Sequence, residues 1–387
     1  MKAVELSSLH VEALRDAISA PRLEEFLREF EGEDALPKAI DLYNWNARLA
    51  AECFTAIGHL EVLLRNALDK NLSEHFHEQE RGIPWFLQHG IGLTEQARNE
   101  ITRARERLSQ RRRSDSRHRI VAELTLGFWC SLLKPRYEGT LWTRSLYKCF
   151  KDPDTGKTPD RSEVAKLADK IRQTRNRVAH HNYLRTFDVP NAMSAVFDLA
   201  KLLSQPYADW MSQNSRWCEI YEERPKVDID TVVVAAGIEA WSMYERLSIY
   251  ACQEGRFFRD CEHIAFYEKQ HIHRQVPAII KRFDGVAFTN ENSARLEASE
   301  DPFERRLGQV IRETLTHGLP TWSITRGERR QVFLLTQIRE KQEGNDGHII
   351  LTNDIPHRHR GRGSAFTQRQ RYVSSLRLRT ATTTDEL

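Results

Sequence analysis

The sequence predicts an all-α helical bundle in the N-terminal part of the chain, followed by a smaller α+β domain. Apolar residues recur at helical spacing through the first half, whereas short β-type runs appear beyond about residue 230. A polar, proline-bearing segment, Tyr221–Asp230, separates the two kinds of pattern. We therefore expect a helical domain over residues 1–215, a linker over 216–230 and an α+β domain over 231–387.

The expected helices follow from the spacing of apolar residues. The longest predicted helix has an apolar stripe of six residues at three- to five-residue steps: Leu49, Phe54, Ile57, Leu60, Leu64 and Leu68. A turn-forming stretch, Lys151–Pro159, precedes Ser162, which we expect to cap a helix running to about Leu184. The predicted helices are Ala35–Phe76, Thr94–Arg113, Arg119–Leu133, Ser162–Leu184 and Asn191–Met211.

The second half combines predicted strands with helical pieces. The strands are expected at Thr231–Gly237, Gln331–Ile338 and Gly347–Asn353, with a helix at Pro302–His317 between them. The role of this domain does not follow from its sequence. Its Arg-rich C-terminal segment, His357–Arg379, carries seven arginines and no acidic residue, which fits either a basic flank on nucleic acid or a disordered tail.

Composition excludes some classes of protein and leaves nucleic-acid binding open. The formal net charge is only +3, but arginine outnumbers lysine 44 to 14, and arginine makes the better forked contact to phosphate. Six cysteines without regular spacing and the lack of a long apolar run predict a cytoplasmic protein with reduced thiols and no membrane span. No glycine-rich nucleotide motif occurs, so we expect no cofactor.

The segment Lys170–Arg185, KIRQTRNRVAHHNYLR, concentrates phosphate-seeking side chains on a predicted helix. Arg175, Asn176 and His180 form the pattern R-N-x-x-x-H, and Arg175 and His180 are separated by roughly 140° around an ideal helix. Cleavage of RNA without metal requires transfer of a proton from a 2′-hydroxyl, stabilisation of phosphoryl charge and a proton for the 5′-oxygen. Histidine suits the proton transfers and arginine suits the phosphoryl oxygens.

Spacing alone does not identify a site. The same five-residue spacing of arginine and histidine occurs at Arg113 with His118 and at Arg312 with His317. The first pair lies in a polar stretch without a core face, and the second precedes Gly318 and reads as an ordinary helix end. A solvated helix face is the ordinary explanation for each pair until the surrounding sequence is considered.

The surrounding sequence resembles the Abi-like (abortive-infection) branch of the HEPN superfamily. The R-N-x-x-x-H segment matches the family's helix of that pattern, and Tyr43–Phe76 matches its first long helix, with Trp45 and Asn46 followed by Glu61, Arg65 and Asn66. Ile83–Phe86 and Leu124–Phe150 match its middle region in order. The resemblance covers about residues 40 to 205, so the helical domain is expected to be HEPN-like.

The resemblance implies a helical bundle that pairs as a homodimer and cleaves single-stranded RNA without metal, in phage defence or a toxin-like system. By position it implies that Arg175, Asn176 and His180 are catalytic, with Glu61, Arg65, Asn66 and His181 in support. Glu61 either holds Arg175 or His180 in place or forms a structural salt bridge. The alternatives are a non-catalytic RNA-binding or regulatory protein of the same kind, and a structural partner of another toxin or antitoxin subunit. An antitoxin or a phage-derived trigger as a further partner stays open.

Two other groups of residues are weaker candidates. The Arg-rich segment Arg98–Arg119 carries nine arginines and reads either as a solvated face or as a surface that tracks the RNA backbone. For RNA binding we expect four arginines: Arg105, Arg111, Arg112 and Arg177. Five residues could be assembled into a zinc site, but their spacing fits no compact zinc pattern and we expect no metal: Cys252, Cys261, His263, His271 and His273.

Overall fold

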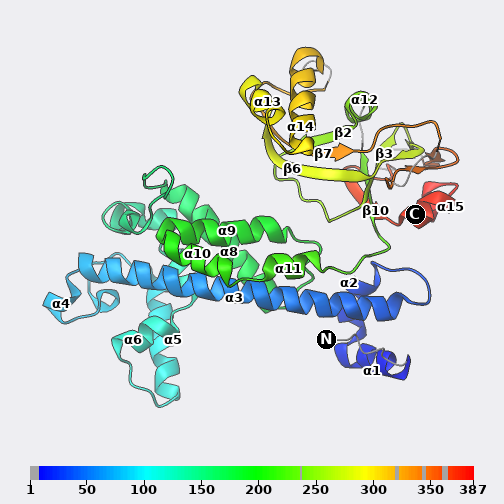
Figure 1. Cartoon of the computed structure of the whole chain (residues 1–387). Coiled ribbons are helices and arrows are strands. Elements are labelled where there is room, and N and C mark those ends of the chain that lie inside the picture. Colours follow the sequence, from blue (N-terminus) through cyan, green and yellow to red (C-terminus); the bar gives the residue numbers. More distant parts are fainter. Residues whose placement is uncertain (1–7, 236–237, 319–321, 342–345, 360–364) are drawn as a thin grey trace. The chain divides into compact units, whose positions relative to one another are not determined.

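The computed structural model describes residues 8–235, 238–318, 322–341, 346–359 and 365–387 (Figure 1). A helical N-terminal region is followed by a mixed α+β region with three small sheets, as the sequence predicts. The chain divides into two compact units, one formed by residues 41–225 and the other by residues 1–40 together with 226–387. The expected domain 1–215 thus differs from this division in its first 40 residues.

A buried carboxylate explains why the first residues group with the C-terminal unit. Glu29 is buried, and its carboxylate lies 3.0 Å from Nη1 of Arg259. The backbone carbonyl of Glu29 accepts from the amide of Asp228 at 2.9 Å, and Lys38 lies 3.7 Å from the carboxylate of Asp228. A buried charge is stable only when paired, and here the partner lies more than 200 residues away in the sequence, where no local pattern could indicate it.

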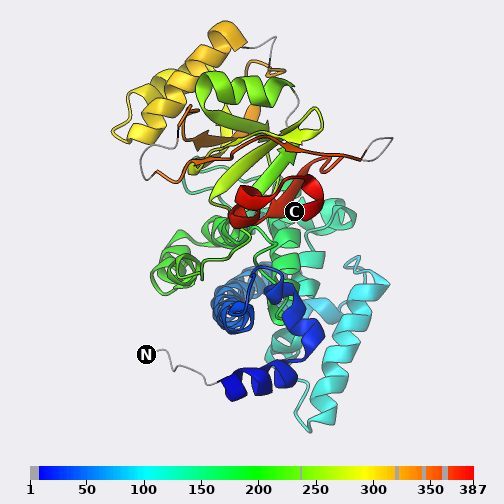
Figure 2. The same cartoon turned by 90° about the vertical axis from the view of Figure 1, so that its right-hand side faces the viewer.

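The N-terminal region is built around the long helix α3. Of the six residues of the predicted apolar stripe, Phe54 is 45% exposed and the others are buried. Figures 1 and 2 show α8 and α9 running alongside α3, with α5 standing apart from it. The α-helices are α1 (Ser8–Ile18), α2 (Ala20–Leu27), α3 (Ala35–His75), α4 (Glu78–Arg81), α5 (Glu95–Gln110), α6 (Arg117–Glu123), α7 (Leu126–Ser131), α8 (Arg161–Ala179), α9 (Val189–Leu203), α10 (Gln205–Gln213) and α11 (Trp217–Glu222). Four short 3₁₀ or π turns are η1 (Trp85–Leu87), η2 (Pro135–Tyr137), η3 (Glu138–Trp142) and η4 (Leu146–Cys149).

Several expected helices are interrupted. The segment expected as one helix over Arg119–Leu133 is split into α6 and α7, because Thr125 caps a new helix by accepting from the amide of Phe128. Ser204, with an extended φ of −167°, separates α9 from α10. Helix α11 lies within the expected linker, where the indole of Trp45 donates to the carbonyl of Ile220 at 2.6 Å.

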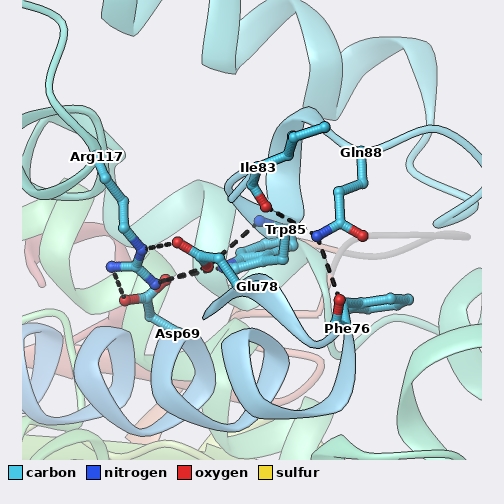
Figure 3. A network of polar contacts seen from close by, with 7 residues as sticks. All are labelled: Asp69, Phe76, Glu78, Ile83, Trp85, Gln88 and Arg117. Atoms are coloured by element: carbon cyan, nitrogen blue, oxygen red, sulfur yellow. Dashed lines mark hydrogen bonds and ion pairs between the residues drawn. The ribbon is translucent and has the colours of Figure 1, made fainter. Parts of the chain in front are cut away.

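A network of polar contacts fixes the far end of α3 (Figure 3). Arg117 donates to Asp69 at 2.9 and 3.0 Å and also pairs with Glu78, while the indole of Trp85 donates to Asp69 at 2.8 Å. Burial raises the pKa of Glu78, but hydrogen bonds from Arg117, Ser73 and the amide of Trp85 outweigh it, so this pKa lies below its usual value. The segment around Arg117, interpreted from the sequence as lacking a core face, therefore contributes a partly buried ion-pair partner.

The C-terminal unit contains a five-stranded sheet of order β10-β1-β3-β4-β9, a three-stranded sheet of order β2-β7-β6 and the pair β5-β8. Helices α12, α13 and α14 pack their apolar residues onto the three-stranded sheet, and Figure 2 shows α15 (red) in this unit. The strands are β1 (Thr231–Ala235), β2 (Ile249–Gln253), β3 (His263–Glu268), β4 (His271–Ile272), β5 (Gln275–Val276), β6 (Ile279–Ala287), β7 (Arg329–Leu335), β8 (Ile349–Ile350), β9 (Ile355–Pro356) and β10 (Gln370–Val373). The helical segments are α12 (Ile238–Leu247), α13 (Asn290–Glu297), α14 (Pro302–Glu313), η5 (Thr314–Gly318), α15 (Ser375–Thr380) and η6 (Thr384–Glu386).

Candidate functional site

Helix α8 carries the R-N-x-x-x-H pattern on its last turn. Asp160, rather than the expected Ser162, caps its N-terminus, in a capping box with Glu163. Its buried residues recur at helical spacing and face the core: Val164, Ala168, Ile171, Thr174 and Val178. Between these positions Arg175 is half-buried and Asn176 is exposed.

The helix ends at Ala179, five residues before the expected end. His180 is its C-cap, and His181 adopts the left-handed conformation with φ 51°. The amide of His181 donates to the carbonyl of Val178 at 3.1 Å, and that of Asn182 donates to the carbonyl of Arg177 at 3.0 Å. This pair of bonds is a Schellman motif, which leaves both histidine side chains exposed at the helix end.

Asn46 of α3 holds the loop that follows the two histidines. Its side chain is buried, donates to the carbonyl of Asn182 at 3.3 Å and accepts from the amide of Leu184 at 2.8 Å. A buried amide group that satisfies two backbone groups fixes the path of the chain at that point. Asn46 is thus a positioning residue that the motif alone did not indicate, although the resemblance included it.

The contacts between α3 and α8 show that the two helices are antiparallel. Asn46 contacts the loop after α8, and farther along α3 the ring of Phe54 lies under the guanidinium of Arg175, 5.9 Å from its centroid. Glu61 is seven residues beyond Phe54, which corresponds to about 10 Å along a helix. Since α8 runs the opposite way, Glu61 faces its middle rather than its C-terminal end.

The electrostatic surroundings of Cys130 agree with this position of Glu61. The thiol of Cys130 lies 3.7 Å from the carbonyl of Ala168 in the middle of α8. Burial raises the pKa of that thiol to about 12, and the charges of Asp169 and Glu61 contribute to the rise. In the part of the chain that the structure describes, Glu61 forms no hydrogen bond or ion pair with Arg175, and no structural salt bridge either.

The other two expected supporting residues of α3 lie still farther from the end of α8. Nε of Arg65 lies 3.4 Å from Oδ1 of Asn66, and this contact is exposed. Arg175, Asn176, His180 and His181 thus lie on the last turn of α8 and directly after it, whereas Arg65 and Asn66 lie elsewhere on α3.

Arg177, expected to bind RNA, contacts its own loop. Its guanidinium donates to the carbonyl of Tyr183 at 3.2 Å and lies 4.9 Å from the centroid of the Phe187 ring. These contacts stabilise the turn after α8.

The other three expected RNA-binding arginines gather at the C-terminal end of α5. Arg105 pairs with Asp115 at 2.8 Å, and Arg111 pairs with Glu123 at 2.7 Å, so acidic neighbours partly neutralise both. Arg112 is exposed, with a left-handed φ of 53°. The hydrogen bonds from Arg105 also lower the pKa of Asp115, which keeps that carboxylate charged.

The residues considered for zinc do not form one cluster. Cys252 is buried on β2, and its thiol lies 3.3 Å from Oε1 of Gln331. Among the described residues, His271 and His273 lie close to Asp354. His263 lies instead beside Asp230 and Glu262, and its Nε2 is 2.8 Å from the carbonyl of Gly347.

Comparisons with known proteins identify no relative of this chain. No helix in the described ranges is long and apolar enough to cross a membrane. The chain matches no protein-family model, and no curated protein or solved structure is significantly similar to it.

Proposed function

We propose that the protein is a metal-independent endoribonuclease that cleaves single-stranded RNA by attack of a 2′-hydroxyl, with Arg175, Asn176 and His180 as its catalytic residues. One observation carries the proposal: Asn176, His180 and His181 are exposed at the C-terminal end of α8, and Arg175 on the same last turn lies over the ring of Phe54. The resemblance of residues 40–205 to Abi-like HEPN proteins supports the same chemistry.

The histidine and the arginine each have a defined part in the reaction. The imidazole of His180 takes the proton of the 2′-hydroxyl while the 2′-oxygen bonds to phosphorus. Arg175 donates to the phosphoryl oxygens as negative charge develops on them. The bond from phosphorus to the 5′-oxygen breaks, and that oxygen gains a proton from a second acid. The products are a 2′,3′-cyclic phosphate and a 5′-hydroxyl.

The second acid is best supplied by another copy of the chain. Two copies facing each other offer one histidine as base and one as acid, and two arginines for the phosphate. A homodimer is therefore part of the proposal, and the exposed ring of Phe54 next to Arg175 lies where such a partner could bury it.

The proposed biological role is inferred from the resemblance to Abi-like HEPN proteins. An RNA-cleaving protein of this kind acts in the cytoplasm in phage defence or as a toxin, and it is restrained by an antitoxin or released by a phage-derived trigger. Expression of the active protein is then expected to arrest growth, and Arg175→Ala is expected to relieve the arrest.

An RNA cleavage assay in EDTA tests the chemistry. We expect His180→Ala and Arg175→Ala to lower the rate on single-stranded RNA by about 10²–10⁴-fold, because each removes a group needed in the transition state. The matched control is His317→Ala, which removes an exposed histidine five residues after Arg312. DNA is expected to survive, since it lacks the 2′-hydroxyl. RNA binding without cleavage would favour the non-catalytic alternative.

A further inference from the structure

The edge of the five-stranded sheet carries two histidines and an aspartate on one face. Strands β4 and β9 are antiparallel, with His271 opposite Pro356 and Ile272 opposite Ile355. Continuing this register places Asp354 opposite His273. Residues two apart on a strand share a face, as do residues directly opposite each other on neighbouring antiparallel strands.

The potential ligand atoms of these three residues converge. One nitrogen of each histidine and one carboxylate oxygen of Asp354 all lie within 4.8 Å of one another. The shortest known separation among them is 3.6 Å, between Nε2 of His271 and Oδ2 of Asp354. Ligands of a tetrahedral zinc ion at 2.0–2.1 Å stand roughly 3.3 Å apart, so a small shift of exposed side chains completes the geometry.

Neighbouring groups orient all three side chains. Nδ1 of His271 lies 3.4 Å from the carbonyl of Lys269, and Nε2 of His273 lies 3.4 Å from Oε2 of Glu268. Oδ1 of Asp354 accepts from the backbone amide of Arg274 at 2.8 Å. Protons donated to these acceptors leave Nε2 of His271 and Nδ1 of His273 with the lone pairs that a metal needs. Such supporting contacts are typical of histidine metal ligands.

Packing makes the arrangement rigid on its inner side. The indole of Trp241 on α12 stacks on the ring of His273, with centroids 3.7 Å apart and planes 5° apart. Glu268 is buried, and its other oxygen lies 3.0 Å from Nζ of Lys269. The side chain of Asp354 is 47% exposed, so the site opens to solvent on its other side.

We propose that His271, His273 and Asp354 bind a divalent transition-metal ion, zinc above all. Two imidazole nitrogens favour zinc and its neighbours over calcium and magnesium, which prefer oxygen ligands alone. Three protein ligands leave a fourth position for water or a bound ligand, as in catalytic rather than structural zinc sites. The site lies outside the unit that contains α8, and the proposed RNA cleavage uses no metal.

Calorimetric titration of the EDTA-treated, dialysed full-length protein with zinc sulfate tests this site. One zinc ion per chain is expected. His271→Ala and the exposed Asp354→Asn should each weaken binding by at least about 100-fold, and Glu268→Gln by about 10–100-fold through loss of the contact to His273. Two controls should leave the affinity unchanged: Glu262→Gln, in the cluster around His263, and the double variant His89→Ala/His118→Ala.

Cobalt provides a second readout, because bound four-coordinate Co²⁺ gives visible absorption that should disappear in His271→Ala and Asp354→Asn. Failure of the wild-type protein to bind zinc at micromolar concentrations would overturn the proposal. So would zinc or cobalt binding that is unchanged in both of these variants. Neither result bears on RNA cleavage, which is measured in EDTA.

Discussion

Arg112 has a backbone conformation that costs stability. Its φ of 53° places it at the left-handed position that follows the C-cap of α5, where glycine is the usual residue. The amide of Arg113 donates to the carbonyl of Leu108 at 2.9 Å, so the motif is formed despite the strain. Arg112 is exposed, so its charge is available to solvent.

Two replacements of Arg112 distinguish the effect of backbone strain on stability from the effect of the charge on RNA binding. Arg112→Gly should raise the free energy of unfolding by about 1 kcal/mol relative to Arg112→Ala, because glycine adopts the left-handed conformation without steric cost. Both variants should weaken RNA binding alike, since both lose the charge. Urea unfolding and RNA titration measure the two effects. Equal stability of the two variants would contradict the strain argument.

His348 is a buried imidazole with a hydrogen-bonding neighbour at each ring nitrogen. Its Nε2–H donates to Oε1 of Gln275 at 2.7 Å, and its Nδ1 lies 2.8 Å from the hydroxyl of Thr336. Burial, and then the charge of Arg339, lowers the pKa of His348 from 6.5 to about 4. The unfolded chain therefore binds this proton at a higher pH than the folded protein does.

Because of this lowered pKa, the contribution of His348 to the free energy of unfolding decreases in acid. The contribution of His348 is complete above pH 6.5 and is lost as the pH falls from 6.5 towards 4, to the extent of roughly 3 kcal/mol. His348→Gln should therefore lose less stability than the wild-type protein between pH 7 and pH 4.5. Urea unfolding at both values measures this, with the exposed His118→Gln as control. An unchanged pH dependence in His348→Gln would show that His348 does not carry the effect.

At the scale of elements, close packing of α13 and α14 depends on Gly308. A Cβ at this position would lie 2.7 Å from the backbone nitrogen of Glu297 and 2.8 Å from the carbonyl oxygen of Ser293. These are backbone atoms, so the helices would have to separate. Gly58 of α3, in contrast, has nothing within 4 Å of such a Cβ.

Replacement of these two glycines by alanine should change the free energy of unfolding in opposite directions. Gly308→Ala should lower the free energy of unfolding by about 1–3 kcal/mol, because overpacking outweighs the gain in helix propensity. Gly58→Ala should raise it by up to about 1 kcal/mol, because propensity acts alone. Urea or thermal unfolding distinguishes them. A stabilising Gly308→Ala would mean that α13 and α14 are not packed this closely.

Helices with a long apolar period could be predicted from the sequence, and their interruptions could not. The period from Leu49 to Leu68 predicted α3 to within a residue or so of its observed ends. The breaks at Thr125 and Ser204 arise from single capping residues inside otherwise helical patterns, which periodicity does not detect. The strands at Thr231 and Gln331 were predicted from β-branched and aromatic runs, but the strand at His271 is two residues long and depends on its neighbours.

Some residues of the candidate site could be predicted from the local sequence, and others could not. Arg175, Asn176 and His180 are close in the sequence, so one helix end brings them together. The contribution of Asn46 and the distance of Glu61 from the end of α8 depend on the antiparallel packing of α3 and α8, which no local pattern specifies. The cluster of His271, His273 and Asp354 likewise depends on strand register.

For the whole molecule, the proposed reaction requires two chains. Because one chain offers one R-N-x-x-x-H helix end, specific activity should fall on dilution as the dimer dissociates. Gel filtration coupled to an activity series over protein concentration measures both quantities on the same samples. Full turnover by a demonstrated monomer would contradict the two-copy mechanism while leaving the roles of Arg175 and His180 open to the variant assay.

The ends of the RNA fragments test the central claim most directly. Single-stranded RNA is incubated with the full-length protein in EDTA, and the fragments are analysed by mass spectrometry beside those from His180→Ala. The account predicts 2′,3′-cyclic phosphate and 5′-hydroxyl ends from the wild-type protein, with the variant slower by about 10²–10⁴-fold. Fragments with 5′-phosphate ends, cleavage abolished by EDTA, or an unchanged rate in His180→Ala would contradict it.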